Sequence, residues 1–435
     1  MKKVHFIGIG GIGISAIARF LNEKGYTISG SDIAESKTTR QLQNEGIEVI
    51  TPHCANAIKD QDFVIYSAAI KDDNIELVTA RQKGIECLSR KEALPMVLDE
   101  KKVFAIAGAH GKSTTTAMLS SLIEGSAIIG AISKQFGSNM RYENSQNIVF
   151  EADESDSSFL NSNPYLAIVT NAEPEHMEHY DNDLAKFHAA YRGFLERAKV
   201  RVINAEDDFL GTLKIDAIRL YPSKDITEMS MVVRDYEPYT SFNLKNLGKF
   251  EAYGMGEHIA IDASLAILAA LDELPLKQVR QNLANYKGIK KRFDILKADK
   301  NFILIDDYAH HPTEIKATLK SVFEYAKLLG ISRIVGIFQP HRYTRLSANI
   351  DEFAKCFDGV SELVILPVYA AGESVIEVDM KEKFKSYTPI FTDKIQRLDD
   401  AIEFVDEYGV KHRLDNGLVI GFGAGDISVQ LRGKK

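Results

Sequence analysis

The stretch VFAIAGAHGKSTTT, residues 103–116, joins an apolar run to a glycine loop and then to a helix-like run. This order is typical of a phosphate loop, because backbone N–H groups and a helix N-terminus can then surround phosphates. Lys112 adds a positive charge, and Ser113 can ligate Mg²⁺. The loop reads G-x-x-G-K-S and is shorter than the full Walker pattern, since Ile106 stands where its first glycine would fall. G-K-S alone is common by chance, but its place between strand and helix predicts ATP binding.

Short apolar runs alternate with helical patterns along the rest of the chain, which predicts α/β units around parallel sheets. We expect three blocks of strands: 3–7, 27–29, 49–50 and 63–66; then 103–107, 147–150, 166–169 and 200–203; then 302–305, 334–338, 363–366 and 418–420. Between the last two blocks we expect a β-rich stretch near 221–253 and a helix near 258–271. Boundaries near residues 97 and 292 divide the chain into domains 1–97, 98–291 and 292–435.

The composition is that of a globular protein with real cores, since 45% of the 435 residues are hydrophobic and 26% are charged. The net charge of -8 argues against a general nucleic-acid binder, which needs a surplus of basic residues. Cys54, Cys87 and Cys356 lie far apart, which favours reduced thiols over a disulfide framework or a thiolate zinc site. The glycine-rich start favours a first strand and its turn over a signal peptide. No other segment has the ~18 consecutive apolar residues of a membrane span, so we expect a cytoplasmic protein.

Earlier in the chain, the segment GIGGIGIS at residues 8–15, called here the first glycine loop, has the G-x-G-x-x-G spacing of a dinucleotide-binding turn. Gly8, Gly10 and Gly13 would let the backbone approach a pyrophosphate at a helix N-terminus. Asp32 stands about twenty positions further on, where NAD-binding turns carry an acidic residue. An NAD-dependent oxidoreductase is therefore one interpretation, but it leaves the phosphate loop at residues 108–113 unexplained.

An acidic run, VFEADESDSSF at residues 149–159, places four carboxylates directly after an expected strand: Glu151, Asp153, Glu154 and Asp156. Open α/β sheets bind ligands at the carboxyl ends of their strands, and Mg²⁺ is often held by one or two carboxylates together with phosphates. A solvated acidic turn is the alternative. The next expected strand ends near His176 and His179, either of which could be structural. Zinc is possible, but the predominance of Asp and Glu favours magnesium.

Polar or glycine-rich turns follow the strands of the third block: IDDYAHHPTEI (305–315), FQPHRYTRL (338–346), YAAGES (369–374) and GFGAGDIS (421–428). The first turn carries more histidine, tyrosine and aspartate than the start of a helix requires. In the second, Arg342 and Arg345 beside an aromatic residue favour a clamp for a carboxylate or phosphate; pairing with surface acids is the alternative. Together the four turns predict one rim of a ligand site.

Six segments resemble the Mur ligases, in the same order and over residues 5 to about 428: GIGGIGIS, GAHGKSTTT, FEADESDSSFL, TNAEPEHME, IDDYAHHPTEI and FQPHRYTR. The resemblance implies an α/β fold of three domains: a Rossmann-like N-terminal domain for a UDP-sugar, a central P-loop ATPase-like domain for ATP and Mg²⁺, and a Rossmann-like C-terminal domain for an amino acid. It also implies that ATP phosphorylates the lactyl carboxylate of UDP-N-acetylmuramate and that L-alanine attacks the acyl phosphate. A recycling ligase that adds a preformed peptide to the same sugar is the nearest alternative, and a non-enzymatic ATP switch is a more distant one.

The resemblance also assigns the site residues. For ATP they are Gly108, Ala109, His110, Gly111, Lys112, Ser113 and Thr114, with His258 and Asp262 on the adenine side. For the UDP-sugar they are Gly10, Gly11, Gly13, Asp32 and Ser67, and for L-alanine they are Asp307, Tyr308, His310, Arg342 and Arg345. For Mg²⁺ they are Ser113, Thr114, Glu151 and His176, and the catalytic set is Lys112, Glu151, His176, Arg292 and His310.

In two places the chain departs from the family. The adenine-side pattern H-N-x-x-N is here His258 followed by three apolar residues and Asp262. Several sister ligases use a carbamylated lysine in the central domain. Between His176 and Lys199 we find no counterpart of this lysine, as expected for the member that adds alanine. With an ATP loop downstream, we interpret the pyrophosphate at the first loop as that of a UDP-sugar. We expect only small-molecule partners, no nucleic acid or membrane, and a monomer or a weak homodimer.

Overall fold

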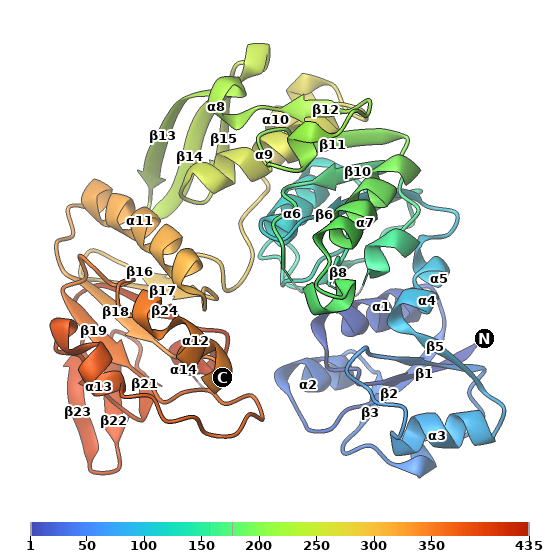
Figure 1. Ribbon diagram of the computed structural model, residues 1–435, viewed down its shortest axis with the longest axis horizontal. Coiled ribbons are helices and arrows are strands. Elements are labelled where there is room, and N and C mark those ends of the chain that lie inside the picture. Colours follow the sequence, from blue (N-terminus) through green and yellow to red (C-terminus); the bar gives the residue numbers. More distant parts are fainter. Residues whose placement is uncertain (1, 156, 176, 434–435) are drawn as a thin grey trace. The chain divides into compact units, whose positions relative to one another are not determined.

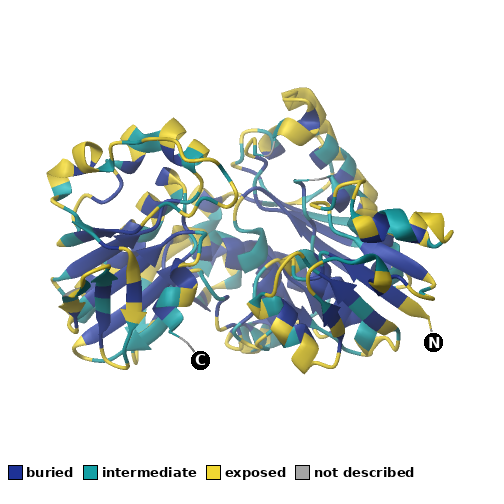
Figure 2. Ribbon diagram, turned by 90° about the horizontal axis from the view of Figure 1, so that it is seen from below, coloured by how far each residue is buried: buried dark blue, intermediate teal, exposed yellow. Residues whose placement is uncertain are grey.

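The computed structural model describes residues 2–155, 157–175 and 177–433, and these divide into two compact units. The first unit holds residues up to 228 together with 242–252 and 258–287. The second holds residues 229–241 and 253–257 and continues from Gly288. In both units most strands are buried, while many of the helices that cover them have exposed outer faces (Figure 2).

The N-terminal sheet of the first unit has five parallel strands in the order β3-β2-β1-β4-β5 (Figure 1). Its strands are β1 (Lys3–Ile7), β2 (Thr27–Ser31), β3 (Glu48–Ile50), β4 (Phe63–Tyr66) and β5 (Glu86–Ser89), and its helices are α1 (Ile12–Glu23), α2 (Lys37–Asn44), α3 (Ile75–Gln82), α4 (Arg90–Ala93) and α5 (Pro95–Leu98). The strand β1 ends where Gly8 takes a φ of 77°, a conformation that favours glycine. The four strands predicted for the first block are confirmed.

The central sheet of the first unit has seven strands in the order β12-β11-β10-β6-β9-β7-β8. They are β6 (Lys102–Ala107), β7 (Ser126–Ile128), β8 (Met140–Arg141), β9 (Asn147–Glu151), β10 (Leu166–Val169), β11 (Val200–Asn204) and β12 (Ile218–Leu220). Only the β7–β8 pair is antiparallel. The helices are α6 (Lys112–Leu122), α7 (Leu184–Arg197), α8 (Pro222–Asp225), α9 (Glu257–Ala270) and α10 (Leu276–Leu283). The strand–loop–helix order predicted for residues 103–116 is confirmed.

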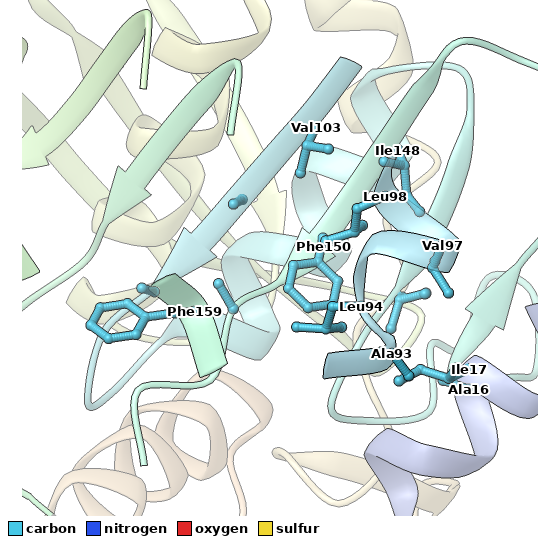
Figure 3. Close-up of a cluster of buried hydrophobic side chains, with 14 of the residues drawn as sticks. Ala16, Ile17, Ala93, Leu94, Val97, Leu98, Val103, Ile148, Phe150 and Phe159 are labelled. Carbon is cyan, nitrogen blue, oxygen red and sulfur yellow. The ribbon is translucent and has the colours of Figure 1, made fainter. Parts of the chain in front are cut away.

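One hydrophobic core joins the two sheets of the first unit. Ile17 on α1 belongs to one cluster with Ala93 and Leu94, and Val103 and Phe150 extend this cluster into the central sheet (Figure 3). Burial of apolar surface across this boundary stabilises the two sheets together, at ~25 cal/mol per Å² of apolar area. The segment α4–α5 is therefore fixed between the first glycine loop and the central sheet.

A three-stranded sheet, β13 (Ile226–Arg234), β14 (Glu237–Leu244) and β15 (Lys249–Tyr253), confirms the β-rich stretch predicted near 221–253.

The second unit contains a six-stranded sheet in the order β16-β17-β24-β18-β19-β20, which is parallel except for β16. Its strands are β16 (Asp294–Ala298), β17 (Phe302–Asp307), β18 (Ile334–Phe338), β19 (Glu362–Ile365), β20 (Ile390–Phe391) and β24 (Gly417–Phe422), and its helices are α11 (Pro312–Leu329), α12 (Tyr343–Phe353), α13 (Met380–Lys383) and α14 (Ile427–Arg432).

A further antiparallel sheet, β21 (Lys394–Arg397), β22 (Ile402–Asp406) and β23 (Gly409–Leu414), was not among the predicted strands. Its apolar side chains Ile395, Ile402 and Phe404 pack with strands of the six-stranded sheet. Among the described residues, no helix has the length and apolar character needed to cross a membrane.

Candidate functional site

The phosphate loop between β6 and α6 has a backbone shape that only glycine fits. Gly108 and Gly111 have φ values of 141° and 79°. A Cβ added at Gly108 would overlap the Thr170 hydroxyl, and one added at Gly111 would overlap the carboxylate of Asp262. The side chain of Asn171, after β10, braces the loop through the amide and carbonyl groups of His110 (3.1 and 2.9 Å). The two glycines and Asn171 therefore fix the conformation of the loop.

The Lys112 ammonium is folded back onto this loop. Its Nζ donates to the carbonyls of Gly108 (3.0 Å) and Ala109 (3.3 Å) and to Oε1 of Glu154 (2.9 Å). Burial alone would lower the pKa of Lys112, but the charges of Glu154 and Glu151 raise it above the ordinary value. The ammonium thus stays charged at neutral pH and available to an incoming phosphate.

Glu154 is the buried partner of that ammonium. Its side chain is 1% exposed, and Oε2 has no hydrogen-bond partner among the residues that the structure describes. Burial raises the pKa of Glu154 above its ordinary value, although the charge of Lys112 acts to lower it. The sequence placed Glu154 in the acidic run but gave no sign of this role.

Glu151 lies beside the start of α6, with its carboxylate against the Ser113 hydroxyl. Oε1 accepts from the Ser113 hydroxyl (2.9 Å), and Oε2 accepts from the Gly130 N–H (2.6 Å). Burial raises the pKa of Glu151. A hydroxyl and a carboxylate at one point are hard oxygen donors, which fit Mg²⁺ better than zinc. No group of three His, Cys, Asp or Glu side chains that could hold a metal occurs among the described residues.

The other residues predicted for ATP and Mg²⁺ are placed as follows. Thr114 follows Ser113 in the first turn of α6. His258 and Asp262 lie one turn apart on α9, and Asp262 is 5% exposed with its carboxylate against Gly111. That position is beside the phosphate loop, while contact with adenine stays a prediction. His176 lies outside the described residues.

The first glycine loop is held in shape by Asp32. Its Oδ2 accepts from the Gly10 N–H (2.7 Å) and its Oδ1 from the Ile33 N–H (2.8 Å). A Cβ added at Gly8 would lie 3.1 Å from Cβ of Ser67, so the end of β4 packs against the loop. Gly11 is the N-cap of α1 and forms no side-chain cap. The structure therefore brings the predicted residues together, with Asp32 supporting the loop from within.

The turn after β17 carries three of the residues predicted for the amino acid. Asp307 is buried and accepts from the N–H groups of Phe293 (2.7 Å) and Ala309 (2.9 Å). Burial raises the pKa of Asp307 to about 6, against the charge of Arg292. The rings of Tyr308 and His310 meet edge to face at 5.1 Å. Asp307 thus fixes the turn, and the two rings line it.

Glu314 organises the same turn and was not predicted. Its Oε2 accepts from the N–H groups of His310 (3.0 Å) and His311 (3.2 Å), and Arg292 Nη1 lies 4.0 Å from Oε1. The spacing of a capping box, with Glu314 three residues after the N-cap His311, could have identified it. Burial lowers the pKa of His310, against the charge of Glu314, so its neutral form is favoured.

The turn after β18 adds two arginines to this rim. Arg345 Nη1 donates to His341 Nδ1 (3.1 Å), and the His341 ring stacks on Tyr369 at 5.7 Å. Arg342 is the N-cap of α12. Burial, followed by the charges of Arg345, His310 and Arg342, lowers the pKa of His341 to about 4. A neutral histidine between two guanidinium groups leaves a positive rim that suits a carboxylate.

Three family models match successive parts of the chain. They are the "Mur ligase family, catalytic domain" at residues 3–102, the "Mur ligase middle domain" at 106–223 and the "Mur ligase, glutamate ligase domain" at 291–424. The chain belongs to the Mur ligase family, a family of ATP-dependent ligases. The predicted fold class, α/β with the three domains of a Mur ligase, is confirmed. Family membership also favours a ligase over an NAD-dependent oxidoreductase.

The chain is 80% identical to the UDP-N-acetylmuramate–L-alanine ligase of Campylobacter curvus over 433 residues, which cover 100% of both chains. Its structure is similar to that of the UDP-N-acetylmuramate–alanine ligase of Thermotoga maritima, with a TM-score of 0.82 and 28% identity over 99% of this chain and 97% of that one. The murein peptide ligase of Psychrobacter arcticus has a TM-score of 0.64 and 21% identity over 99% and 97% of the two chains, which shows a shared fold alone.

Proposed function

We propose that the protein is an ATP-dependent ligase that joins L-alanine to the lactyl carboxylate of UDP-N-acetylmuramate in peptidoglycan precursor synthesis. The observation that carries this proposal is the 80% identity, over the full length of both chains, to a relative that bears the name of this activity. Residues 1–97 bind the UDP-sugar, residues 98–291 bind ATP, and residues 292–435 bind the amino acid. The peptide-adding alternative has support only from a shared fold.

Activation of the lactyl carboxylate takes place at the phosphate loop. A carboxylate oxygen attacks the γ-phosphorus, ADP leaves, and an acyl phosphate forms, so the protein must position reactants and neutralise charge. Lys112 turns from its loop carbonyls to the phosphates, with Gly108, Ala109, His110 and Gly111 around them. Mg²⁺, when bound, supplies further positive charge at the phosphates. Ser113, Thr114 and Glu151 would hold it, with His176 added by the family resemblance.

Formation of the amide depends on residues of the second unit. Arg342 and Arg345 hold the carboxylate of L-alanine, and Tyr308 and His310 line the site near its amine. The amine must lose a proton before it attacks the acyl carbon and expels phosphate. His310 Nδ1 lies 3.0 Å from the Tyr308 carbonyl, which can only accept, so Nδ1 carries the proton. Nε2 then has a lone pair that can take the proton from the amine.

Other residues fix the turns and loops that carry the binding groups. Asp307 fixes the turn that carries Tyr308 and His310, and Arg292 packs over the Tyr308 ring at 5.6 Å. Asp32 and Ser67 shape the loop of Gly10, Gly11 and Gly13 for the UDP-sugar, and His258 with Asp262 completes the ATP site. We propose a cytoplasmic enzyme, where ATP and amino acids are supplied, that acts as a monomer or a weak homodimer on small molecules.

Phosphate release from ATP tests this function. The protein is given UDP-N-acetylmuramate and each amino acid in turn, with L-Ala-γ-D-Glu-meso-diaminopimelate as a separate acceptor. Release that requires both the UDP-sugar and L-alanine supports the proposal. Release with the peptide but not with L-alanine would transfer the assignment to the recycling reaction, and release without any acceptor would refute both.

A further inference from the structure

Arg90 lies between the first glycine loop and the acidic run that follows β9. Its Nη2 donates to Oδ2 of Asp153 (3.1 Å) and to the hydroxyl of Ser158 (3.2 Å). On the other side of the guanidinium, a Cβ added at Gly13 would lie 2.8 Å from Nη1. One end of the group thus faces the acidic run, and the other faces the first turn of α1. The Arg90 side chain is 21% exposed, so solvent screens its charge only in part.

The backbone that carries Arg90 has little freedom to move. Ser89 and Glu92 form a capping box, in which Glu92 Oε2 accepts from the Ser89 N–H (2.8 Å) and the Ser89 hydroxyl accepts from the Glu92 N–H (3.4 Å). Ala93 and Leu94 follow directly and lie in the core shared with α1 and the central sheet (Figure 3). Arg90 therefore projects from a fixed point toward α1 and the acidic run.

The partners of Arg90 are fixed as well. Asp153 Oδ1 accepts from the Ser155 N–H (3.0 Å), and the Asp153 carbonyl accepts from Ser158 Oγ (3.2 Å) and from the N–H of the buried Phe159 (3.0 Å). Asp153 Oδ2 accepts the hydrogen bond from Arg90 Nη2 (3.1 Å), and this contact orients the guanidinium.

The first glycine loop offers backbone amides to a ligand, but its acidic residue, Asp32, already accepts from two of the N–H groups in this region. The N-cap of α1 is Gly11, which has no side chain to cap the helix, and the first turn of α1 carries no acidic residue. Arg90 adds a guanidinium to these donors, with Nη1 directly against Gly13. Amides at a helix N-terminus and a guanidinium fork are together suited to a diphosphate.

We infer that Arg90 binds the diphosphate of the UDP-sugar at the first glycine loop, and that Asp153 and Ser158 are positioning residues that aim its guanidinium there. This inference rests on the proposed function and adds a residue to its sugar site. The acidic run then serves two ligands, because Glu151 and Glu154 face the ATP loop, whereas Asp153 acts on the other substrate through Arg90. A residue next to the ATP site thereby sets the affinity for the UDP-sugar.

Direct binding separates this role from a merely structural one. Calorimetry measures the Kd of UDP-N-acetylmuramate, and separately of UDP, for wild type, Arg90→Gln, Arg90→Lys and the control Arg81→Gln. Arg81 forms an exposed pair with Asp72 (3.0 Å) in the same domain and does not touch the loop. Arg90→Gln should raise the Kd of both ligands about 10–100-fold, because charge-assisted hydrogen bonds are lost. Arg90→Lys should restore only part of this affinity, because lysine lacks the planar guanidinium fork. The Kd values of Arg81→Gln should stay within about twofold of those of the wild type.

A double-mutant cycle tests the part assigned to Asp153. Asp153→Asn should raise the Kd of UDP-N-acetylmuramate about 3–10-fold in the wild-type background. In the Arg90→Gln background it should cause no further loss of affinity, because Asp153 acts through Arg90. The Kd of a non-hydrolysable ATP analogue should stay within about twofold in all four proteins, which also reports that the core remains folded.

Three outcomes would overturn the inference: unchanged UDP-sugar affinity in Arg90→Gln, an equal loss from Asp153→Asn in both backgrounds, or a parallel loss of ATP-analogue binding. Failure of the wild-type protein to bind UDP-N-acetylmuramate would instead refute the proposed function.

Discussion

Lys112 Nζ lies 2.9 Å from Glu154 Oε1, and this ion pair joins the phosphate loop to the acidic run after β9. The Glu154 side chain is almost wholly buried, so its charge depends on the ammonium for compensation. The same ammonium must bind phosphates in the ATP complex. Stability and catalysis therefore place separate demands on one side chain, and variants can separate them.

For catalysis, Lys112→Ala should abolish phosphate release while the Kd for UDP-N-acetylmuramate stays within about twofold of wild type, because the two loops bind different nucleotides. Turnover and calorimetry on the same preparation measure the two effects. Loss of both together would argue against separate nucleotide sites.

For stability, Lys112→Ala should lower the free energy of unfolding by about 1–3 kcal/mol, since it leaves Glu154 buried without its cation. The double variant Lys112→Ala/Glu154→Gln should regain at least half of that loss and still show no turnover. Differential scanning calorimetry compares the three proteins. If the second substitution regains nothing, the pair does not carry the stability that its burial implies.

Metal dependence should report on Glu151. Glu151→Gln should raise the Mg²⁺ concentration for half-maximal activity about tenfold or more, because the amide is a weaker ligand for a hard cation. Glu143→Gln is the matched control, since Glu143 also accepts a glycine N–H, that of Gly125 (2.8 Å), in the same domain. Equal Mg²⁺ curves for both variants would remove Glu151 from the metal site.

Acid should destabilise the second unit through His341. Its pKa of about 4 in the folded state lies below the ordinary 6.5, so between these values the unfolded chain binds a proton here that the folded protein does not. The free energy of unfolding should therefore fall as the pH is lowered from about 6.5 to about 4, and level off below. After allowance for solvent screening we expect a loss of about 1–2 kcal/mol.

The control for this titration is His341→Gln, in which the His341 contribution to the fall in the free energy of unfolding should be absent. Asp307, with a pKa raised from 3.8 to about 6, acts in the opposite sense between those values. Because Asp307 is present in both proteins, the difference between them isolates His341. Parallel stability curves for the two proteins across this pH range would contradict the assignment.

Recognition of the amino acid should depend on Arg345. Arg345→Gln should raise KM for L-alanine about 10–100-fold and leave KM for UDP-N-acetylmuramate nearly unchanged, as expected when a charge-assisted contact to one substrate is lost. Arg333→Gln is the control, because Arg333 pairs with Glu362 (2.7 Å) in the same unit, away from this rim. A rise in KM for all substrates would point to general distortion.

Much of the fold could be predicted because its strands are short apolar runs between glycine, aspartate and helical patterns. The β21–β23 sheet was missed because its strands are only four to six residues long and rich in charged side chains, so they resemble the loops around them. At the sites, motif residues such as Lys112 and Glu151 were predicted, and the structure brings them together. Glu154 and Arg90 were not assigned roles, because each acts through a contact that depends on tertiary packing: Lys112 meets Glu154 across 42 residues of sequence, and Arg90 meets Asp153 across 63. Glu314 acts locally, and the spacing of its capping box with His311 could have identified it.

The central claim, activation of a carboxylate by phosphoryl transfer, has one direct test. UDP-N-acetylmuramate labelled with ¹⁸O in both lactyl carboxylate oxygens is turned over with ATP and L-alanine, and the phosphate released is analysed by mass. If an acyl phosphate forms and the amine attacks its carbonyl carbon, the bridging oxygen leaves with phosphate, so each phosphate carries one ¹⁸O. Phosphate without ¹⁸O, at full conversion to the amide, would contradict the mechanism.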